Sequence, residues 1–281
     1  MSVRPRVTSR FARSLGSLLA ALATACGVSQ DSEVQLGRQG AEQVSSQLPL
    51  VRDPVVTSYV QELGLSIART TPRADLDWRF FVVDSREINA FALPGGFIYV
   101  NRGLIERAQQ LDELAGALGH EIGHVVRRHS VDQMQKQTGA NVAVELGCRL
   151  TDLCSSDVAR AAIQVGGAAL FARYSREDEV EADSEAVVNV IRAGLDPEGI
   201  PVLFRRLLEE RRTWPMRIEA FFASHPLEEE RIRATERAIA ELDPAQLQGL
   251  KRDDPSYQAF RERLDALPPP PPPRPRGQMS P

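Results

Sequence analysis

The sequence predicts an α+β fold, a mostly helical domain that contains a small β-sheet. Apolar residues recur at the spacing of amphipathic helices over much of the chain. Two short segments, 78–85 and 89–100, are instead rich in the β-branched and aromatic residues that strands favour. With 281 residues, 42% of them hydrophobic, the chain is long enough to bury the core of one large domain or two small ones.

The N-terminal residues are typical of an export signal. Four arginines precede a short run of apolar and small residues, LGSLLAALATAC, which is too short to anchor stably across a membrane. We therefore expect residues 1–25 to be a signal peptide, whose removal would change the formal net charge from −4 to −8. The protein is expected to be exported.

Two types of cleavage fit this signal. Ala23 to Ala25 form an A-x-A site for ordinary signal peptidase, which would leave a soluble periplasmic protein. The same residues before Cys26 resemble a bacterial lipobox, although Ala23 stands where Leu is usual. We favour a lipoprotein with a lipidated Cys26, because a cysteine at that position is otherwise unexplained. Gly27 then indicates the periplasmic face of the outer membrane.

The domain that follows begins with a helix and continues into strands. Residues 26–36 are expected to be a linker and 37–240 the main domain. A helix is predicted over 53–69, where Asp53 can cap the N-terminus and a proline occupies the first turn. In the strand region, the sequence Pro-Gly-Gly at 94–96 predicts a turn between two short strands.

Helices are expected after the strands. One begins at NRGLIERA and a strongly apolar one spans 111–129. The segment 130–170 is predicted as helices broken by a loop, and it contains Cys148 and Cys154. A disulfide between these two is feasible in an exported protein, and two buried thiols are the alternative.

The second half of the chain is predicted to be helical up to about residue 240. The sequence from Ser175 fits a capping box, and the helix that it begins should end before Gly194. Residues 241–267 form a C-terminal helical extension, and the proline-rich residues 268–281 are expected to be a disordered tail. Basic residues form no dense stripe, so we expect no nucleic-acid partner.

The stretch LGHEIGHVVRRH contains three of the four histidines of the chain. On a helix, His120 and His124 project from one face with Glu121 beside them. This is the HExxH arrangement, in which two imidazoles bind zinc and the glutamate is the general base. At about 100° per residue, His129 would lie roughly 140° from His124, so a regular helix would make it a surface or outer-layer residue.

Two imidazoles leave the metal site incomplete, and a third ligand must come from another element. The acid-rich helix SREDEVEADSEA, residues 175–186, is the best candidate. Helical spacing allows three carboxylate pairs, and spacing alone does not choose among them. The pairs are Glu177 with Glu181, Glu179 with Asp183, and Glu181 with Glu185.

HEIGH, followed some fifty residues later by SREDEVEAD, resembles peptidase family M48, the group of HtpX and the CAAX prenyl endopeptidase. The segment NAFALPGGFIYVNRGLI is similar to the strand that contacts substrate in that family. The resemblance is strongest to the exported bacterial BepA/LoiP-like branch and covers about residues 37–235. It implies a zincin-type metallopeptidase domain, with the small sheet beside the HExxH helix and one Zn²⁺ per chain.

The resemblance also assigns site residues. The family's ExxxD motif implies Glu179 as the third zinc ligand, with Asp183 behind it to accept a ring N–H from a ligand histidine. His225 and Arg231 match an HP element and a later arginine that are thought to stabilise the oxyanion. In the BepA/LoiP-like branch, this histidine can instead cap the zinc.

The resemblance implies a function as well. The protein is expected to be a zinc metalloendopeptidase that hydrolyses misfolded or unassembled cell-envelope proteins. An extended substrate would pair with the strand segment Asn89, Ala90, Phe91 and Ala92 through main-chain hydrogen bonds, unless the segment is an internal hairpin. The alternative is a zinc-binding, chaperone-like assembly factor with a self-inhibited site. The sequence predicts no oligomeric state.

Overall fold

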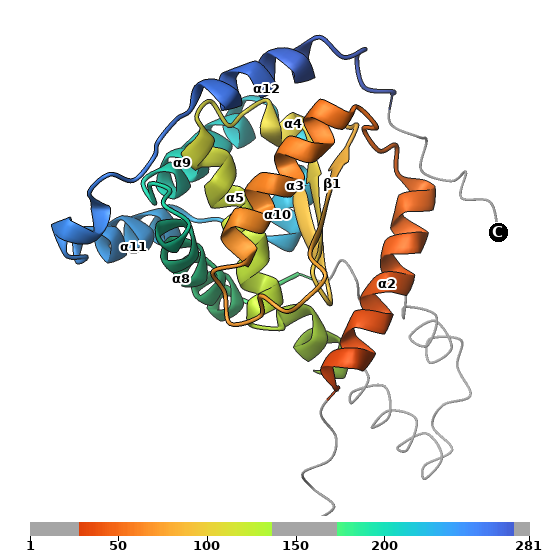
Figure 1. Cartoon of the computed structure of the whole chain (residues 1–281), viewed down its shortest axis with the longest axis horizontal. Helices are drawn as coiled ribbons and strands as arrows, with labels where there is room; N and C mark the ends of the chain where they lie inside the picture. Colours follow the sequence, from red (N-terminus) through yellow and green to blue (C-terminus); the bar gives the residue numbers. More distant parts are fainter. Residues whose placement is uncertain (1–27, 137–172, 273–281) are drawn as a thin grey trace, which may run out of the picture.

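The computed structural model describes residues 28–136 and 173–272 of the chain (Figure 1). Several predictions concern residues outside these ranges and are not tested by the fold. They are the signal peptide, the lipidated Cys26, the pair Cys148 and Cys154, and the end of the tail from residue 273. The described part is an α+β structure, mostly helical with one three-stranded sheet, as predicted.

The sheet consists of β1 (Arg79–Val83), β2 (Ala90–Leu93) and β3 (Phe97–Asn101) in the order β1-β3-β2. β3 is central, parallel to β1 and antiparallel to β2. The predicted turn joins β2 to β3, and Gly95 and Gly96 adopt positive φ angles of 76° and 95° there. Such angles favour glycine because it has no Cβ. Because β3 is the central strand, β2 lies at an edge of the sheet.

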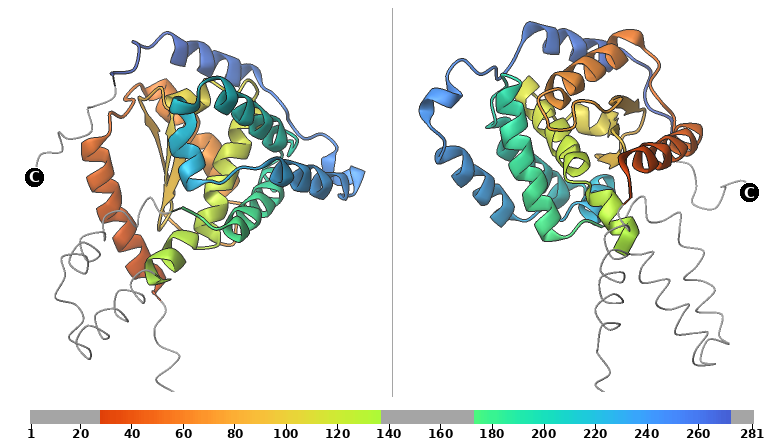
Figure 2. Two further views of the ribbon diagram at one scale, coloured as in Figure 1. Left: turned by 180° about the vertical axis from the view of Figure 1, so that it is seen from behind. Right: turned by 60° about the horizontal axis from the view of Figure 1, so that its bottom comes forward.

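Alternate residues of the strands face two different layers of the protein. On one face, Phe80, Ile98 and Val100 belong to the main hydrophobic core, together with helix α3 (Pro54–Ala68) and helix α5 (Leu111–Val126). On the other face, Phe91 and Tyr99 pack with residues of helix α2 (Gln30–Gln47). The sheet is thus buried on both sides (Figures 1 and 2).

Helix α2 starts earlier than the sequence suggested. Residues 30–36 were expected to belong to a linker, but they form its first turns. Ser29 accepts a hydrogen bond from the backbone N–H of Ser32, and Glu33 is completely buried in an ion pair with Arg73. A polar helix with a buried charge pair has little apolar periodicity, which explains why the sequence pattern did not identify it.

The helix α5 packs against α8 (Arg176–Arg192) and α9 (Gly199–Thr213), and the short α4 (Arg102–Ile105) precedes it. The predicted capping box forms at the start of α8, where Ser175 and Asp178 exchange hydrogen bonds. Close approach of α8 depends on Gly123, where an added Cβ would lie 2.8 Å from the carbonyl oxygen of Ala182. Helices α10 (Pro215–Ser224) and α11 (Glu229–Ala240) complete this side.

The C-terminal residues return to the main core. After a 3₁₀ turn, η2 (Pro244–Leu247), helix α12 (Pro255–Asp265) packs on α3. Phe260 stacks on Tyr59 with ring centroids 4.4 Å apart, and the Tyr257 hydroxyl donates to the carbonyl of Ala108 at 2.7 Å. Within the described ranges, no helix is both long enough and apolar enough to cross a membrane.

Candidate metal centre

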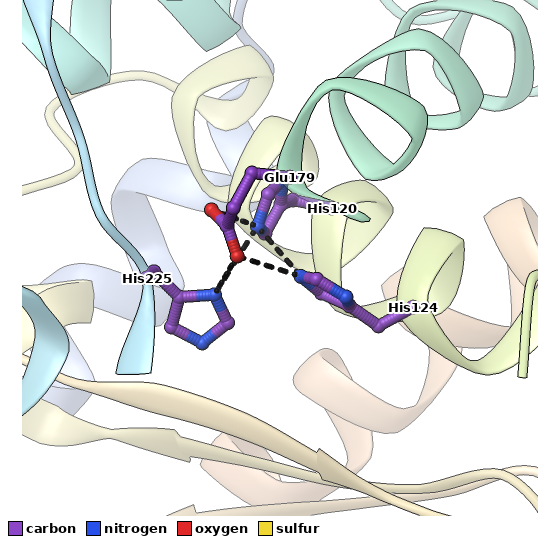
Figure 3. Close-up of side chains that lie close together, drawn as sticks. All are labelled: His120, His124, Glu179 and His225. Atoms are coloured by element: carbon purple, nitrogen blue, oxygen red, sulfur yellow. Dashed lines mark hydrogen bonds and ion pairs between the residues drawn. The ribbon is translucent and has the colours of Figure 1, made fainter. Parts of the chain in front are cut away.

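The helix α5 presents His120 and His124 on one face, as their spacing predicted. Both side chains are buried, and their Nε2 atoms lie 3.1 Å apart (Figure 3). Two successive turns of α5 therefore each bring one imidazole nitrogen to the same place. This point lies inside the protein, between α5, α8 and the segment after α10.

Glu179 and His225 close the group from two other elements. Glu179, in the first turn of α8, has Oε1 at 3.3 Å from Nε2 of His124 and Oε2 at 3.6 Å from Nε2 of His120. His225, which caps α10, has Nδ1 at 3.0 Å from Oε1 of Glu179 and 3.4 Å from Nε2 of His120. Figure 3 shows all four side chains turned toward one another.

The other carboxylates of α8 are oriented differently. Glu177 is exposed, and the side chain of Glu181 is 52% exposed. Glu185 is partly buried but lies outside the group of ligand atoms. Of the three carboxylate pairs that helical spacing allowed, the structure turns Glu179 and Asp183 toward the histidines.

The geometry of these atoms fits a zinc ion. Zinc binds imidazole nitrogen at 2.0–2.1 Å with tetrahedral geometry, so its ligands lie about 3.3 Å from one another. Five separations between ligand atoms of His120, His124, Glu179 and His225 run from 3.0 to 3.6 Å. One ligand atom from each of the four lies within 4.8 Å of all the others. Nitrogen and carboxylate donors of this kind suit zinc.

Asp183 and Arg231 form a support behind His120. Nδ1 of His120 lies 2.9 Å from Oδ1 of Asp183. The same carboxylate accepts two hydrogen bonds from Arg231, one from Nη2 to Oδ1 at 2.8 Å and one from Nε to Oδ2 at 2.9 Å. A carboxylate whose oxygens accept from a guanidinium acts as an acceptor toward the imidazole as well. Nδ1 of His120 therefore carries the proton, and its Nε2 presents a lone pair to the centre.

Arg231 is buried among acceptors. Besides Asp183, it donates to Oε2 of Glu179 and, at 2.7 Å, to the carbonyl of Pro226. Burial would lower the pKa of Arg231, but Asp183 and Glu179 raise it, so the guanidinium stays charged. It lies behind these two carboxylates and holds both of them in position.

Burial and charge shift the protonation of the central groups. Burial lowers the pKa of His124 well below its usual value, so this ring stays neutral and can offer its Nε2 lone pair. Burial alone would raise the pKa of Glu179, but the charge of His225 and the hydrogen bond from its Nδ1 lower it. An ionised Glu179 among histidines is the state that a metal ligand requires.

Glu121 lies next to the group but is not a member of it. It is 1% exposed, and its Oε1 lies 3.6 Å from Nε2 of His225. Burial raises its pKa above the usual value of a glutamate, although the charge of His225 opposes this. Oε2 of Glu121 and Nε2 of His225 have no hydrogen-bond partner among the described residues. Buried polar atoms of this kind usually mark the place of a water or a ligand.

His129 does not lie on the surface. The helix α5 ends at Val126, and Arg128 adopts a φ of 62°, which breaks the regular path assumed from the sequence. The chain changes direction there, and His129 is buried with its Nδ1 2.9 Å from Nδ1 of His124. The expectation of a surface residue is therefore wrong, and the alternative of an outer-layer histidine stays a prediction. The helical angle failed because one left-handed residue changed the direction of the chain.

Tyr174 was not predicted from the sequence. Its ring stacks on His124 with centroids 3.8 Å apart, and its hydroxyl lies 2.9 Å from Oγ of Ser130. Burial raises the pKa of Tyr174, so its hydroxyl stays protonated. Its position directly before the Ser175 cap was the one available sign, because that cap fixes where α8 begins relative to the histidines.

The predicted substrate strand is the edge strand β2, beside α5. The carbonyl of Asn89 accepts from the N–H of Asn101, so Asn89, Phe91 and Leu93 direct their backbone groups toward β3. The backbone groups of Ala90 and Ala92 therefore point away from the sheet. Among the described residues, no backbone group pairs with Ala90 or Ala92 on that side.

Comparisons with known proteins agree with this geometry. The model of peptidase family M48 matches residues 54–239, which include every residue of the centre. The chain is 28% identical over 226 residues to the beta-barrel assembly-enhancing protease of Escherichia coli, covering 77% of this chain and 45% of that protein. This chain thus spans about half the length of that relative.

Two further relatives are also named as metallopeptidases. The mitochondrial metalloendopeptidase OMA1 of Schizosaccharomyces pombe is 29% identical over 248 residues, which are 84% of this chain and 70% of that protein. The metalloprotease YcaL of Escherichia coli is 32% identical over 157 residues, 55% of this chain and 59% of that protein. Since the family model matches more than half of the chain, this protein belongs to peptidase family M48.

Proposed function

We propose that the protein is a zinc-dependent metalloendopeptidase. In this proposal His120, His124 and Glu179 hold one Zn²⁺ per chain, and Glu121 is the general base. The proposal is supported above all by the 3.1 Å separation of the two Nε2 atoms. Nδ1 of His120 lies against Asp183, and Nδ1 of His124 lies 2.9 Å from Nδ1 of His129. If both Nδ1 atoms carry the ring proton, two Nε2 lone pairs face each other at the centre, and a cation between them removes that repulsion.

The reaction needs a proton carrier beside the metal, and Glu121 has the required position and environment. When bound, zinc lowers the pKa of a coordinated water to about 7 and polarises the substrate carbonyl. Glu121 takes a proton from the attacking water and delivers it to the leaving amine. Its burial and raised pKa suit a group that must both accept and release this proton.

His225 and Arg231 have different roles in this scheme. Nε2 of His225 lies near Glu121, has no partner among the described residues and can donate to the oxyanion that forms on the carbonyl. Arg231 acts one layer further out, because its guanidinium is engaged by Glu179 and Asp183. We therefore assign it the positioning of these carboxylates.

The substrate is expected to bind as an added strand. The segment from Asn89 to Ala92 covers most of the edge strand β2, and the outward backbone groups of Ala90 and Ala92 can pair with an extended peptide. Only extended or unfolded segments can pair in this way. This favours misfolded or unassembled polypeptides over folded proteins as substrates.

We place these substrates in the cell envelope of a bacterium. The support comes from the export signal that the sequence predicts and from the relatives named as beta-barrel assembly-enhancing proteases. A lipidated Cys26 would hold the protein at the periplasmic face of the outer membrane. Mass spectrometry of the mature N-terminus tests this, and an unmodified Cys26 would indicate a soluble periplasmic protein instead.

A second function is favoured by one observation. His225 has Nδ1 within 3.4 Å of both Glu179 and His120, so it can occupy the fourth ligand position that a catalytic zinc leaves open. A protein held in this state would be a zinc-binding, chaperone-like assembly factor with a self-inhibited site. The activity of His225→Ala distinguishes the two functions, because release of a capping ligand increases cleavage and loss of an oxyanion donor decreases it.

The main experiment compares wild type with Glu121→Gln. Zinc content is measured by elemental analysis, and cleavage is measured on an unfolded protein substrate. We expect one zinc per chain in both proteins and a loss of cleavage in the variant by a factor of 10² or more. Equal cleavage by both proteins would reject the mechanism. Absence of zinc from the wild type would reject the metal centre.

A further inference from the structure

His129 contacts a predicted metal ligand at the atom that does not face the metal. Nδ1 of His129 lies 2.9 Å from Nδ1 of His124, and both rings are buried. Two nitrogens at this distance share a single proton, which one of them donates to the other. Which ring donates decides whether His124 can bind a metal through Nε2.

The environment of His129 identifies the donor. Nε2 of His129 faces two carboxylates of α8, with Oε2 of Glu181 at 3.6 Å and Oδ1 of Asp178 at 3.8 Å. Carboxylates only accept, so they favour the proton of the neutral His129 ring on Nε2. Nδ1 of His129 is then an acceptor, and Nδ1 of His124 carries the shared proton.

We propose that His129 is a positioning residue for the metal, which accepts the Nδ1–H of His124 and so fixes the Nε2 lone pair of His124 toward the centre. The proposal rests on the proposed zinc site. In this arrangement each of the two ligand histidines donates its Nδ1–H to an acceptor behind it, His120 to Asp183 and His124 to His129. Acceptors behind ligand histidines orient the ring and raise its basicity.

The local chain conformation is built to bring His129 to this place. Arg128, with its φ of 62°, changes the direction of the chain just after the end of α5. Its guanidinium contacts α2 and the residues just before that helix, since Nε lies 2.9 Å from Oε2 of Glu33 and Nη2 donates to the carbonyl of Val28. Glu33 is itself fixed by two hydrogen bonds from Arg73, at 2.7 and 3.0 Å. A left-handed arginine is unfavourable in isolation, and these contacts hold it in place.

Tyr174 restricts the remaining freedom of His124. Its ring lies against the face of His124, with an interplanar angle of 17°. The His124 ring is therefore fixed by stacking on one face and by a hydrogen bond at Nδ1. Stacking alone does not select a tautomer, so the hydrogen bond is the part of the arrangement that substitution at His129 can test.

The test uses two substitutions that separate hydrogen bonding from packing. His129→Phe fills the space of the ring but has no acceptor, whereas the Oδ1 of His129→Asn stands at the position of Nδ1 and can accept. Zinc affinity is measured by competition with a chelator of known affinity. We expect the phenylalanine variant to bind zinc 10- to 100-fold more weakly, and the asparagine variant to stay close to wild type.

The outcomes are distinct. An asparagine variant as weak as the phenylalanine variant, or a phenylalanine variant with wild-type affinity, overturns the role of His129. A wild type without zinc affinity would contradict the proposed function instead. A second measurement needs no substitution and covers the case in which the phenylalanine variant does not fold. Imidazole ¹⁵N NMR of the zinc-bound wild type should show a protonated Nδ1 on His124, and a metallated Nδ1 would overturn the proposal.

Discussion

The two oxygens of Glu179 contact different neighbours, and this division explains how one carboxylate fits between three histidines and an arginine. Oε1 lies 3.0 Å from His225 and 3.3 Å from His124, whereas Oε2 accepts from Arg231. The arginine offsets the negative charge that a completely buried carboxylate would otherwise carry uncompensated. One oxygen is therefore left for a cation at the centre.

This arrangement predicts the effect of Glu179→Gln on zinc binding. The amide keeps the shape of the side chain but removes its negative charge, which both faces His124 and pairs with Arg231. We expect zinc affinity to fall by more than the 10- to 100-fold that the loss of an outer-layer partner typically costs. Chelator competition measures the change.

The matched control is Glu177→Gln, because Glu177 lies two residues away on the same helix and is exposed. Its zinc affinity should equal that of wild type. If the two variants bind zinc equally well, Glu179 is not a ligand. If both are weakened equally, the effect belongs to the overall charge of α8 and not to the centre.

Asp112 provides a prediction on pH, away from the centre. It is 1% exposed, neither carboxylate oxygen has a hydrogen-bond partner among the described residues, and Nε of Arg252 lies 3.5 Å away. Burial raises its pKa to about 6. The folded state therefore holds this proton at a pH where the unfolded chain has lost it, so ionisation of Asp112 reduces stability as pH rises from about 4 to about 6.

Asp112→Asn should remove this penalty. Relative to wild type, its free energy of unfolding should increase between pH 4.5 and pH 7.5 by about 2 kcal/mol, since one pKa unit corresponds to about 1.4 kcal/mol and part of the penalty is already present at pH 4.5. Urea unfolding at several pH values measures the difference, in which contributions common to both proteins cancel. Parallel stability curves for the two proteins would contradict the assignment.

At the scale of elements, those with local signals were predictable and those that depend on distant contacts were not. The Asp53 and Ser175 caps and the turn at Gly95 are encoded by neighbouring residues, and the structure has them where they were expected. The break after Val126 has no such signal. Arg128 is held in its conformation by Glu33, which lies 95 positions earlier in the chain.

The contact between α5 and α8 is the element on which the centre depends. Two histidines come from α5, and Glu179 with Asp183 come from α8, so their distance is set by how closely the helices pack. At Gly123, an added Cβ would lie 2.8 Å from the carbonyl oxygen and 3.1 Å from Cα of Ala182. Both atoms are backbone and cannot rotate away.

Gly123→Ala should therefore separate the two helices. We expect a loss of about 1–3 kcal/mol in the free energy of unfolding, together with weaker zinc binding. Within a helix, alanine is about 1 kcal/mol more stabilising than glycine, so a lower free energy of unfolding would have to come from crowding against Ala182. Urea unfolding and chelator competition measure the two effects.

Gly119→Ala is the control on the same helix face. Its Cβ would meet Cγ1 of Val190 at 3.0 Å, and the next atoms, of Ala186, lie at 3.5 Å. A side-chain methyl can shift more easily than backbone, so both effects should be smaller than for Gly123→Ala. Equal effects at the two positions would show that zinc binding does not depend on the approach near Ala182.

At the scale of the whole molecule, the ends of the described chain are parts of one structure. The sheet lies between the layer of α3 and α5 and the layer of α2, and α12 covers α3 from the other end of the sequence (Figure 1). The order β1-β3-β2 was not predictable, because the parallel pairing of β1 with β3 depends on both layers being present. The extension after residue 240 likewise gave only a weak helical pattern and no sign of where it packs.

Phe260→Ala tests whether this extension shares the core of the domain. Phe260 is 1% exposed and stacks on Tyr59 with an interplanar angle of 15°, so its removal leaves a cavity between α12 and α3. We expect the free energy of unfolding to fall by about 3–5 kcal/mol, in a single transition that far-UV circular dichroism and tryptophan fluorescence report together.

Met216→Ala is the control, because it truncates a large apolar side chain that is 87% exposed and should change stability by less than about 0.5 kcal/mol. A first, separate transition in Phe260→Ala, with the fluorescence transition left at its wild-type position, would mean that α12 unfolds independently. With a common transition, the contact with Tyr59 and that with Ala108 belong to the same cooperative unit as the metal centre.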